Sequence, residues 1–259
     1  MRAVVTGASS GIGRDIARCL AARGIELVLV ARREARLTEL AAELPVPADI
    51  YSCDMADPDA CIELHRRVSA KPVDILVNDA GLGVFGAFAE TDLDRELGLI
   101  DVNIRALHIL TKLFYRDFVR RGSGHILNVA SSAAFLPGPL LSSYYASKAY
   151  VLRLTEALHE ELRRMGSRVT VSVFCPGPVA TEFDTVADVR FHVKGISSEQ
   201  AAKAAVDGLF RGRLVIVPGW QMKAVHVGSR LLPDRLLMRL AWHMQSRKMQ
   251  EDRRGKEKP

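Results

Sequence analysis

At 259 residues and 48% hydrophobic composition, the chain is long enough to bury a full α/β core without a second domain. Its four cysteines show no C-x-x-C spacing, which argues against a zinc site, favours free thiols in a reducing compartment and leaves no metal site predicted. The net charge of +6 comes from residues 211–259, where twelve Lys or Arg stand against four Asp or Glu. No nucleic-acid reader motif accompanies this charge, so no nucleic-acid partner is expected.

Residues 2–6 predict a short buried strand that leads directly into a glycine-rich turn and then into a helical pattern. Such a turn lets the backbone approach a pyrophosphate and points helix N–H groups at it. A second predicted strand at 26–31 completes a βαβ unit. The glycines follow the pattern G-x-x-x-G-x-G, and the residues expected to hold a dinucleotide here are Gly7, Ser9, Ser10, Gly11, Ile12 and Gly13.

The second strand is followed by Arg32 and Arg33, where an acidic residue would favour the ribose 2′-hydroxyl of NAD. Guanidinium groups suit a 2′-phosphate, so NADP(H) is expected in preference to NAD(H). Arg32 is the first candidate for that contact, with Arg33 and Arg14 as further ones. The alternative is that Arg32 and Arg33 only cap a solvated helix start.

Further strands are predicted at 48–53, 74–77, 124–129, 168–174 and 213–217, with long helices at 92–121 and 142–165. The Val, Ile and Leu content of the strands suits a parallel sheet buried on both faces. We therefore expect an α/β fold with a Rossmann-type doubly wound parallel sheet of about seven strands and helices on both faces. Residues 1–218 would form the catalytic and dinucleotide-binding domain, and 219–259 a helical extension and charged tail of the same domain.

Tyr144 and Lys148 stand four residues apart at the start of a predicted helix, and Ser131 precedes Tyr144 by thirteen residues. The i, i+4 spacing places the ammonium beside the phenol. A free phenol, with a pKa of about 10, is a poor base at neutral pH, and a nearby cation favours its phenolate. A serine hydroxyl can hold a carbonyl or alcohol oxygen while the proton moves. Pairing Ser132 with Tyr145 keeps the spacing of thirteen but loses the lysine, so Tyr144 is preferred.

These motifs give the chain a strong resemblance to the short-chain dehydrogenase/reductase family, in its single-domain form, from Thr6 to about Thr181. The pieces that carry the resemblance follow in order along the chain. They are Thr6–Gly13, Asp54, Asn78–Gly81, Asn103, Ser131, Tyr144-x-x-x-Lys148 and Pro176–Thr181.

The resemblance implies a catalytic tetrad of Asn103, Ser131, Tyr144 and Lys148. Tyr144 would be the general acid/base, Lys148 would lower its pKa and bind the nicotinamide ribose, Ser131 would bind the substrate oxygen, and Asn103 would kink its helix and hold a water that relays protons. The remaining implied cofactor contacts are Asp54 and Met55 near the adenine, Asn78, Ala80 and Gly81 along the cleft, and Pro176, Gly177, Val179 and Thr181 beside the nicotinamide. Asp79 departs from the asparagine that is usual in the family.

The substrate would meet three segments that vary within this family. They are the stretch with Phe85 and Phe88, residues 135–141, and a lid at 182–196 that includes Phe183, Phe191 and His192. Their apolar character favours a lipophilic alcohol or carbonyl, although each aromatic residue could equally belong to the core, and His192 is interpreted as a surface residue.

The C-terminal extension repeats Leu231, Leu232, Leu236, Leu237, Leu240, Ala241 and Met244 at helical spacing, with a separate stripe of Arg235, Arg239, His243 and Arg247. This amphipathic pattern has two interpretations. The helix packs on its own domain or on a second subunit, or it contacts a membrane or partner through residues 230–248. Because the first strand begins at residue 2 and no apolar run approaches a membrane span, we expect a cytoplasmic protein, with peripheral contact at the inner face of a membrane as the alternative.

The leading functional hypothesis is an NADP(H)-dependent oxidoreductase that interconverts a carbonyl and a secondary alcohol by hydride transfer, as a homodimer or homotetramer. The alternative is a cofactor-binding sensor or docking protein that acts through its basic C-terminal helix. Epimerisation or dehydration on the same fold is compatible with the tetrad but has no positive support.

Overall fold

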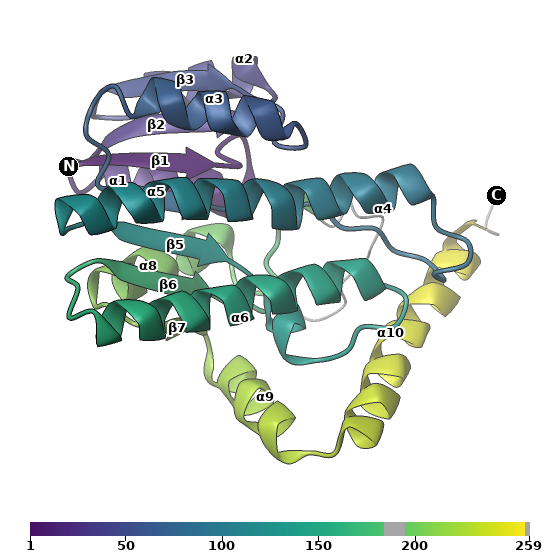
Figure 1. The fold of residues 1–259 in the computed structure, drawn as a ribbon. Coiled ribbons are helices and arrows are strands. Elements are labelled where there is room, and N and C mark those ends of the chain that lie inside the picture. The colour runs from purple at the N-terminus through teal and green to yellow at the C-terminus, as the bar shows by residue number, and fades with distance from the viewer. Residues whose placement is uncertain (184–194, 257–259) are drawn as a thin grey trace.

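The computed structural model describes residues 1–183 and 195–256, apart from the side chains of 230, 244 and 247–256 (Figure 1). A single seven-stranded sheet, parallel throughout, has the order β3-β2-β1-β4-β5-β6-β7. The strands are β1 (Arg2–Thr6), β2 (Glu26–Ala31), β3 (Ala48–Ser52), β4 (Ile75–Asn78), β5 (His125–Val129), β6 (Thr170–Phe174) and β7 (Val215–Ile216). The predicted doubly wound parallel sheet is confirmed.

Helices cover both faces of the sheet because successive strand residues alternate between two apolar clusters. Ala3 and Val5 pack with α1 (Gly11–Ala21), α2 (Glu34–Glu43) and α8 (Ser198–Phe210), whereas Val4 packs with α3 (Pro58–Val68), α5 (Leu107–Arg121) and α6 (Ser142–Arg164). This two-sided burial explains why the strands read as nearly continuous runs of Val, Ile and Leu.

The long helix predicted at 92–121 has three parts. These are α4 (Leu93–Ile100), the π-helical segment η1 (Asp101–Ala106) and α5. The helix predicted at 142–165 is α6, and a short 3-10 helix, η2 (Ser132–Phe135), lies between it and β5.

The C-terminal extension forms a helical hairpin of α9 (Trp220–Leu231) and α10 (Asp234–Lys256), which projects from the β7 side of the sheet (Figure 1). Only part of the expected apolar face of α10 is buried in the chain itself. Leu237, Ala241 and Gln245, at i, i+4 and i+8, are buried, whereas Leu236 and Leu240 are more than 40% exposed. None of the helices in the described part of the chain combines the length and hydropathy that a bilayer-spanning segment needs.

Candidate active site

The expected site residues gather beyond the carboxyl ends of the strands, where the strand order reverses between β1 and β4. This reversal is where doubly wound sheets bind their ligands, because crossovers leave β1 and β4 in opposite directions. The glycine-rich turn follows β1, residues 78–81 follow β4, and Ser131 follows β5. The topology therefore brings three motifs that lie far apart in the sequence to one edge of the sheet.

The turn between β1 and α1 has the backbone geometry that glycine permits. Gly7 and Gly11 have φ of 71° and 56°, and a Cβ on Gly13 would lie 2.6 Å from the Gly7 carbonyl oxygen. The helix α1 starts after Ser10, whose side chain makes no capping hydrogen bond. The first N–H groups of α1 are therefore not capped by Ser10, and the site fits a pyrophosphate group.

Thr6 ties this turn to the segment after β4. Its hydroxyl oxygen accepts hydrogen bonds from the Asp79 and Ala80 N–H groups at 3.1 and 3.2 Å and donates to the Val77 carbonyl at 3.3 Å. The Ala80 nitrogen lies 2.9 Å from where a Gly7 Cβ would stand. The two cofactor-binding segments are thus held together by one side chain and by the close approach that glycine allows.

Asn78, expected along the cofactor cleft, is buried at the end of β4. Its amide donates to Thr111 at 3.0 Å and to Asn128 at 2.9 Å, and Asn128 in turn donates to Thr155 at 3.0 Å. These bonds join β4, β5, α5 and α6 under the site. Sequence analysis missed Thr111, Asn128 and Thr155, because polar residues within apolar strands and helices carry no motif of their own.

Asn103 lies in the π-helical segment, a local widening that is frequent at functional sites. Its side chain is 1% exposed and bonds to both backbone groups of Leu82, accepting from N–H at 2.8 Å and donating to C=O at 2.9 Å. It also donates to the Ser147 hydroxyl at 3.0 Å. The asparagine therefore fixes the loop after β4 against the helix that carries Tyr144 and Lys148.

Lys148 is 5% exposed, and its ammonium donates to the Val129 carbonyl at 3.0 Å. Burial lowers the pKa of Lys148 to about 8, against the opposing effect of Asp79. Nζ lies 5.8 Å from the centre of the Tyr144 ring. A Cβ on Gly81 would lie 3.3 Å from both this Nζ and the Asn103 side-chain oxygen, so the expected glycine, lysine and asparagine meet at one point.

Ser131 precedes η2, and its hydroxyl oxygen accepts from the Ala133 N–H at 3.1 Å. The segment around it packs on α6 and on residues 176–181, since the Ser132 N–H donates to the Pro176 carbonyl at 2.7 Å. Tyr145 bonds elsewhere, because its hydroxyl accepts from Gln245 of α10 at 2.6 Å. Sequence analysis offered no signal for this contact, which joins residues one hundred positions apart.

The segment 176–181 closes over the glycine-rich turn. Val179 forms an isolated bridge with Ile196, and the Thr181 methyl group lies 3.2 Å from where a Gly11 Cβ would stand. Gly177 packs on Met222 of α9. Of the expected lid at 182–196, the structure describes residues 182–183 and 195–196. The Phe183 ring centre lies 5.3 Å from that of Tyr144, whereas Phe191 and His192 lie outside the described residues.

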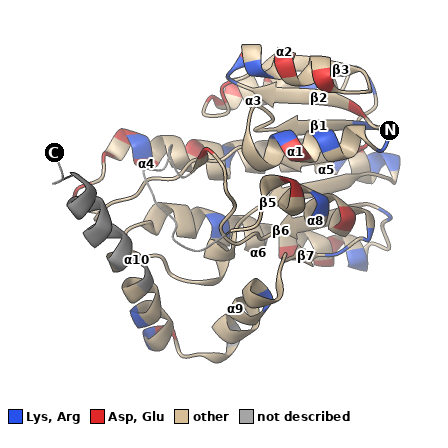
Figure 2. Ribbon diagram, turned by 180° about the vertical axis from the view of Figure 1, so that it is seen from behind, with Lys and Arg blue, Asp and Glu red and all other residues tan. Residues whose placement is uncertain are grey.

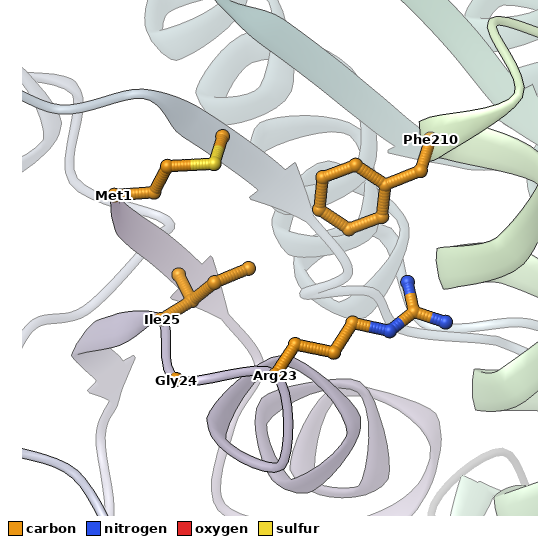
Figure 3. A pocket seen from close by; sticks show the side chains of 5 residues that line it. All are labelled: Met1, Arg23, Gly24, Ile25 and Phe210. Atoms are coloured by element: carbon orange, nitrogen blue, oxygen red, sulfur yellow. The ribbon is translucent and has the colours of Figure 1, made fainter.

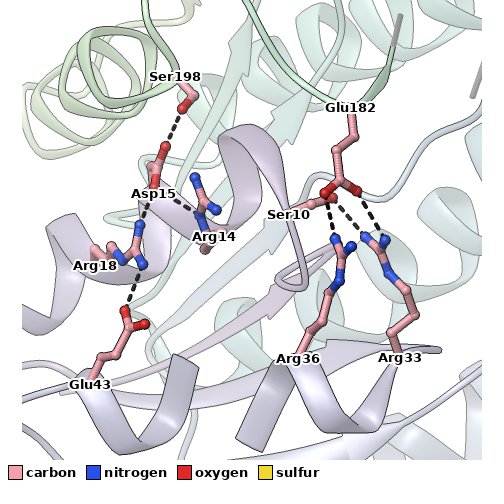
Figure 4. Close-up of polar contacts among 9 residues, drawn as sticks. All are labelled: Ser10, Arg14, Asp15, Arg18, Arg33, Arg36, Glu43, Glu182 and Ser198. Atoms are coloured by element: carbon pink, nitrogen blue, oxygen red, sulfur yellow. Dashed lines mark hydrogen bonds and ion pairs between the residues drawn. The ribbon is translucent and has the colours of Figure 1, made fainter. Parts of the chain in front are cut away.

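Three charged side chains meet at the expected adenosine end of the site (Figure 4). Arg33 donates to Ser9 at 3.1 Å and Ser10 at 3.0 Å and pairs with Glu182 at 2.9 Å, while Arg36 pairs with Glu182 at 2.5 Å. Arg32, the first candidate for a phosphate contact, is exposed. Sequence analysis missed Arg36, although its position three residues after Arg33 was a usable signal.

The remaining expected contacts near the cofactor site are Asp54, Met55 and Arg14. Asp54 is exposed, and its carboxylate accepts from the Ala56 N–H at 3.0 Å, while Met55 is buried beside it. Arg14 pairs with its neighbour Asp15 at 3.2 Å within α1, and Asp15 also accepts a hydrogen bond from Ser198 of α8 (Figure 4). Arg14 thus has a structural partner in α1.

A separate surface cavity of about 280 Å³ lies at the opposite edge of the sheet, where β1 and β2 begin (Figure 3). Arg23 lies over the Phe210 ring, 5.1 Å from its centre, and forms an ion pair with Asp207. Because the Arg23 side chain is already paired and the expected site residues are at the other edge, this cavity is not the candidate site.

Comparison with known proteins identifies the family of the chain. The family model for short chain dehydrogenases matches residues 1–190. A probable oxidoreductase, EphD, of Mycobacterium tuberculosis is 36% identical over 214 residues, which are 80% of this chain but 36% of that protein, so the chain spans about a third of that relative's length. An uncharacterized oxidoreductase of Staphylococcus epidermidis is 36% identical over 80% of this chain and 90% of its own.

Two solved structures share the fold. A short-chain dehydrogenase from Sphingobium yanoikuyae in complex with NADPH is 32% identical, with a TM-score of 0.81 over 89% of this chain and 93% of that one. A short chain dehydrogenase/reductase from Burkholderia phymatum in complex with NAD is 26% identical, with a TM-score of 0.77 over 89% and 92%. The chain belongs to the short chain dehydrogenase family.

Proposed function

We propose that this protein is an oxidoreductase that interconverts a carbonyl and a secondary alcohol with NADP(H). The observation that carries the proposal is the buried ammonium of Lys148 beside the Tyr144 ring, at the edge of the sheet that holds the glycine-rich turn. A cation beside a phenol favours the phenolate and makes it an effective acid/base near neutral pH.

In the proposed mechanism, the bound nicotinamide supplies or accepts the hydride at the substrate carbon. In reduction, Tyr144 gives its proton to the carbonyl oxygen as this oxygen becomes the alcohol, and in oxidation the phenolate takes that proton back. Ser131 holds the same oxygen, and Lys148 stabilises the phenolate. Asn103 holds the helix geometry through Leu82 and Ser147, and the proton relay implied by the family resemblance starts beside it.

The preference for NADP(H) is proposed on the cluster of Arg33 and Arg36 beside Ser9 and Ser10. Planar guanidinium groups bind a 2′-phosphate with paired hydrogen bonds. Related structures hold NADPH in one case and NAD in another, so the arginines are the main support for this choice. The further proposed cofactor contacts are Gly7, Gly11, Ile12, Gly13, Asp54, Met55, Ala80, Gly81, Pro176, Gly177, Val179 and Thr181, with Arg32 as an additional candidate.

A lipophilic substrate is proposed because Tyr144 stands among apolar side chains. Phe85, Leu141, Tyr145 and Phe183 form one cluster with it. Burying the apolar body of a substrate against such side chains contributes about 25 cal/mol per Å² of area removed from water.

Self-association is proposed on an apolar stripe of α4, whose Leu93, Leu97 and Ile100 are exposed at i, i+4 and i+7. Light scattering on the full chain should give a dimer or tetramer, and Leu97→Glu should lower the mass. Residues 1–218 and 219–259 are proposed to be parts of one domain, so deletion of 219–259 should lower the stability of the remainder.

A peripheral membrane contact through residues 230–248 is proposed on the hairpin's exposed side chains. Leu231, the last residue of α9, is 78% exposed, and Arg235 and Arg239 of α10 are exposed after it; Figure 2 shows basic residues on this part of α10. Flotation with vesicles that contain phosphatidylglycerol should carry the protein, and Leu231→Asp should abolish flotation. Equal recovery with neutral vesicles, or none with either, contradicts this contact.

The central test is titration of the purified protein with NADPH and NADH, followed by a turnover screen over ketones with large apolar groups. Tyr144→Phe should keep nucleotide binding and lose turnover, whereas Tyr145→Phe is the matched control that should keep both. Binding of neither nucleotide would contradict the proposed function.

A further inference from the structure

Asp79 places a carboxylate inside the proposed nucleotide site. It follows β4 directly, and its backbone is held by Thr6. Its side-chain oxygen Oδ2 lies 2.5 Å from where a Cβ on Gly13 would stand, so the carboxylate rests against the first turn of α1. A pyrophosphate bound at the N-terminus of α1 would need the same positive end of the helix. The Asp79 carboxylate and a bound pyrophosphate would therefore both lie near the first turn of α1.

The surroundings of Asp79 bring the pKa of its carboxyl group close to neutral pH. Burial raises the pKa of Asp79 to about 7, and Lys148 and the Gly13 N–H oppose that rise. The Gly13 N–H of α1 donates to the Asp79 carboxylate, and the Lys148 ammonium of α6 is the one charged group that acts on it among the residues described. Lys148 is itself influenced by Asp79 and by Cys175, whose pKa burial raises to about 12, so that thiol is neutral at physiological pH.

We propose that nucleotide binding is coupled to uptake of a proton by Asp79. The neutral carboxyl group of Asp79 binds the cofactor phosphates, whereas its carboxylate form repels them. The inference rests on the proposed nucleotide binding and adds a regulatory property to it. Asp79 is a positioning residue for the cofactor and takes no part in the hydride or proton transfer to the substrate.

The sign of the resulting pH dependence follows from linkage. Below neutral pH the Asp79 carboxyl is already protonated, so binding takes up no proton and affinity is highest. Above neutral pH, Asp79 must take up a proton from solvent when the nucleotide binds. The dissociation constant therefore rises with pH by up to about tenfold per pH unit, which is the limit for one linked proton. The bound nucleotide adds negative charge, which raises the pKa of Asp79 further. This widens the pH range over which the dissociation constant changes.

The test measures NADPH binding to the full chain by calorimetry at pH 7.5, in two buffers that differ in ionisation enthalpy. For the wild type we expect uptake of about half to one proton per nucleotide, and a dissociation constant that rises at least fivefold from pH 6.5 to 8. Asp79→Asn keeps the shape and removes the titration, so its proton uptake should fall by at least half and its dissociation constant should vary less with pH. Asp79→Ser serves the same purpose should the amide disturb folding.

Two controls separate Asp79 from other sources of protons. NADH lacks the 2′-phosphate, whose own pKa is near 6, and should show the same uptake as NADPH. Lys148→Met removes the cation that opposes protonation of Asp79, so the linkage should persist and move to higher pH; the double variant should lose it.

The outcomes are distinct. Wild-type binding without proton uptake, or equal uptake by Asp79→Asn, would overturn the inference and leave the proposed function standing. Absence of the linkage in Lys148→Met at every pH from 7.5 to 9 would assign it to the lysine and also overturn the inference. Failure of both nucleotides to bind any variant would contradict the proposed function itself.

Discussion

The Lys148 ammonium lies 5.8 Å from the centre of the Tyr144 ring while donating to the Val129 carbonyl at 3.0 Å. The hydrogen bond anchors the buried cation at the end of β5, and the i, i+4 position on α6 sets its distance from the phenol. The arrangement places a positive charge where it stabilises negative charge on the tyrosine. The chemistry of the proposed enzyme depends on this pair.

Replacing Lys148 with Met should lower turnover by about 100-fold to 10,000-fold, the usual range for loss of acid/base assistance. Because the phenolate loses its cation, the pH at which the remaining activity reaches its maximum should be higher than in the wild type. The pH profile of kcat measures this. An unchanged pH profile in a normally folded variant would show that Lys148 does not set the pKa of Tyr144. Lys112→Met on α5 is the control and should leave the profile unchanged.

Asn103→Leu should destabilise the protein, because it leaves the Leu82 N–H and C=O groups without their partners. We expect a loss of about 2–4 kcal/mol in the free energy of unfolding, since each unpaired buried group costs about 1–3 kcal/mol. Urea denaturation measures this value. Asn103→Asp, which can still accept from the Leu82 N–H, should lose less, and equal losses would show that these bonds are not the cause.

Gly13→Ala should weaken both stability and nucleotide binding, because the new methyl group would lie 2.5 Å from the Asp79 carboxylate and 2.6 Å from the Gly7 carbonyl. Gly98→Ala in α4 is the matched control, since nothing lies within 4 Å of its Cβ position. In a helix interior that change should stabilise by up to about 1 kcal/mol. Similar thermal denaturation of the two variants would contradict the close packing at Gly13.

Glu182 occupies the guanidinium groups that are proposed to bind the 2′-phosphate. Glu182→Gln should therefore tighten NADPH binding by a few fold and leave NADH unchanged, because an exposed ion pair is worth about 0–1 kcal/mol. Arg33→Ala should weaken NADPH alone. Fluorescence titration with both nucleotides gives the comparison, and parallel changes for NADPH and NADH would place the phosphate elsewhere. Arg66→Ala on α3 controls for the loss of a surface charge.

Asp79→Asn should also change how stability depends on pH. Since the pKa of Asp79 is raised to about 7 in the folded protein from 3.8 in the unfolded chain, its contribution to stability is complete below pH 4 and is lost as the pH rises towards 7. The variant should therefore gain on the wild type by more than about 1 kcal/mol at pH 8 and lose that advantage at pH 4. Thermal unfolding at the two pH values tests this, and a gain that is equal at both would exclude titration as its cause.

The elements that the sequence alone determined are those encoded by local patterns. Short continuous runs of Val, Ile and Leu specify strands, and the glycines Gly7, Gly11 and Gly13 specify a strand-to-helix turn. The spacing of Tyr144 and Lys148 places them on one helix face. Crossover handedness then limits the order of the strands and locates the site at their carboxyl ends. For these features, neighbours in sequence are neighbours in space.

Only the tertiary structure decided which distant side chains meet. Asp79 lies against Gly13 and is influenced by the charge of Lys148. Arg36 shares Glu182 with Arg33, and Gln245 bonds to Tyr145 across one hundred residues. The C-terminal hairpin was expected as an amphipathic extension, but the side of α10 that contacts the chain depends on how α10 lies against the beginning of α6. Burial and pairing of charges depend on such contacts, because desolvation and Coulomb energies depend on distances in space.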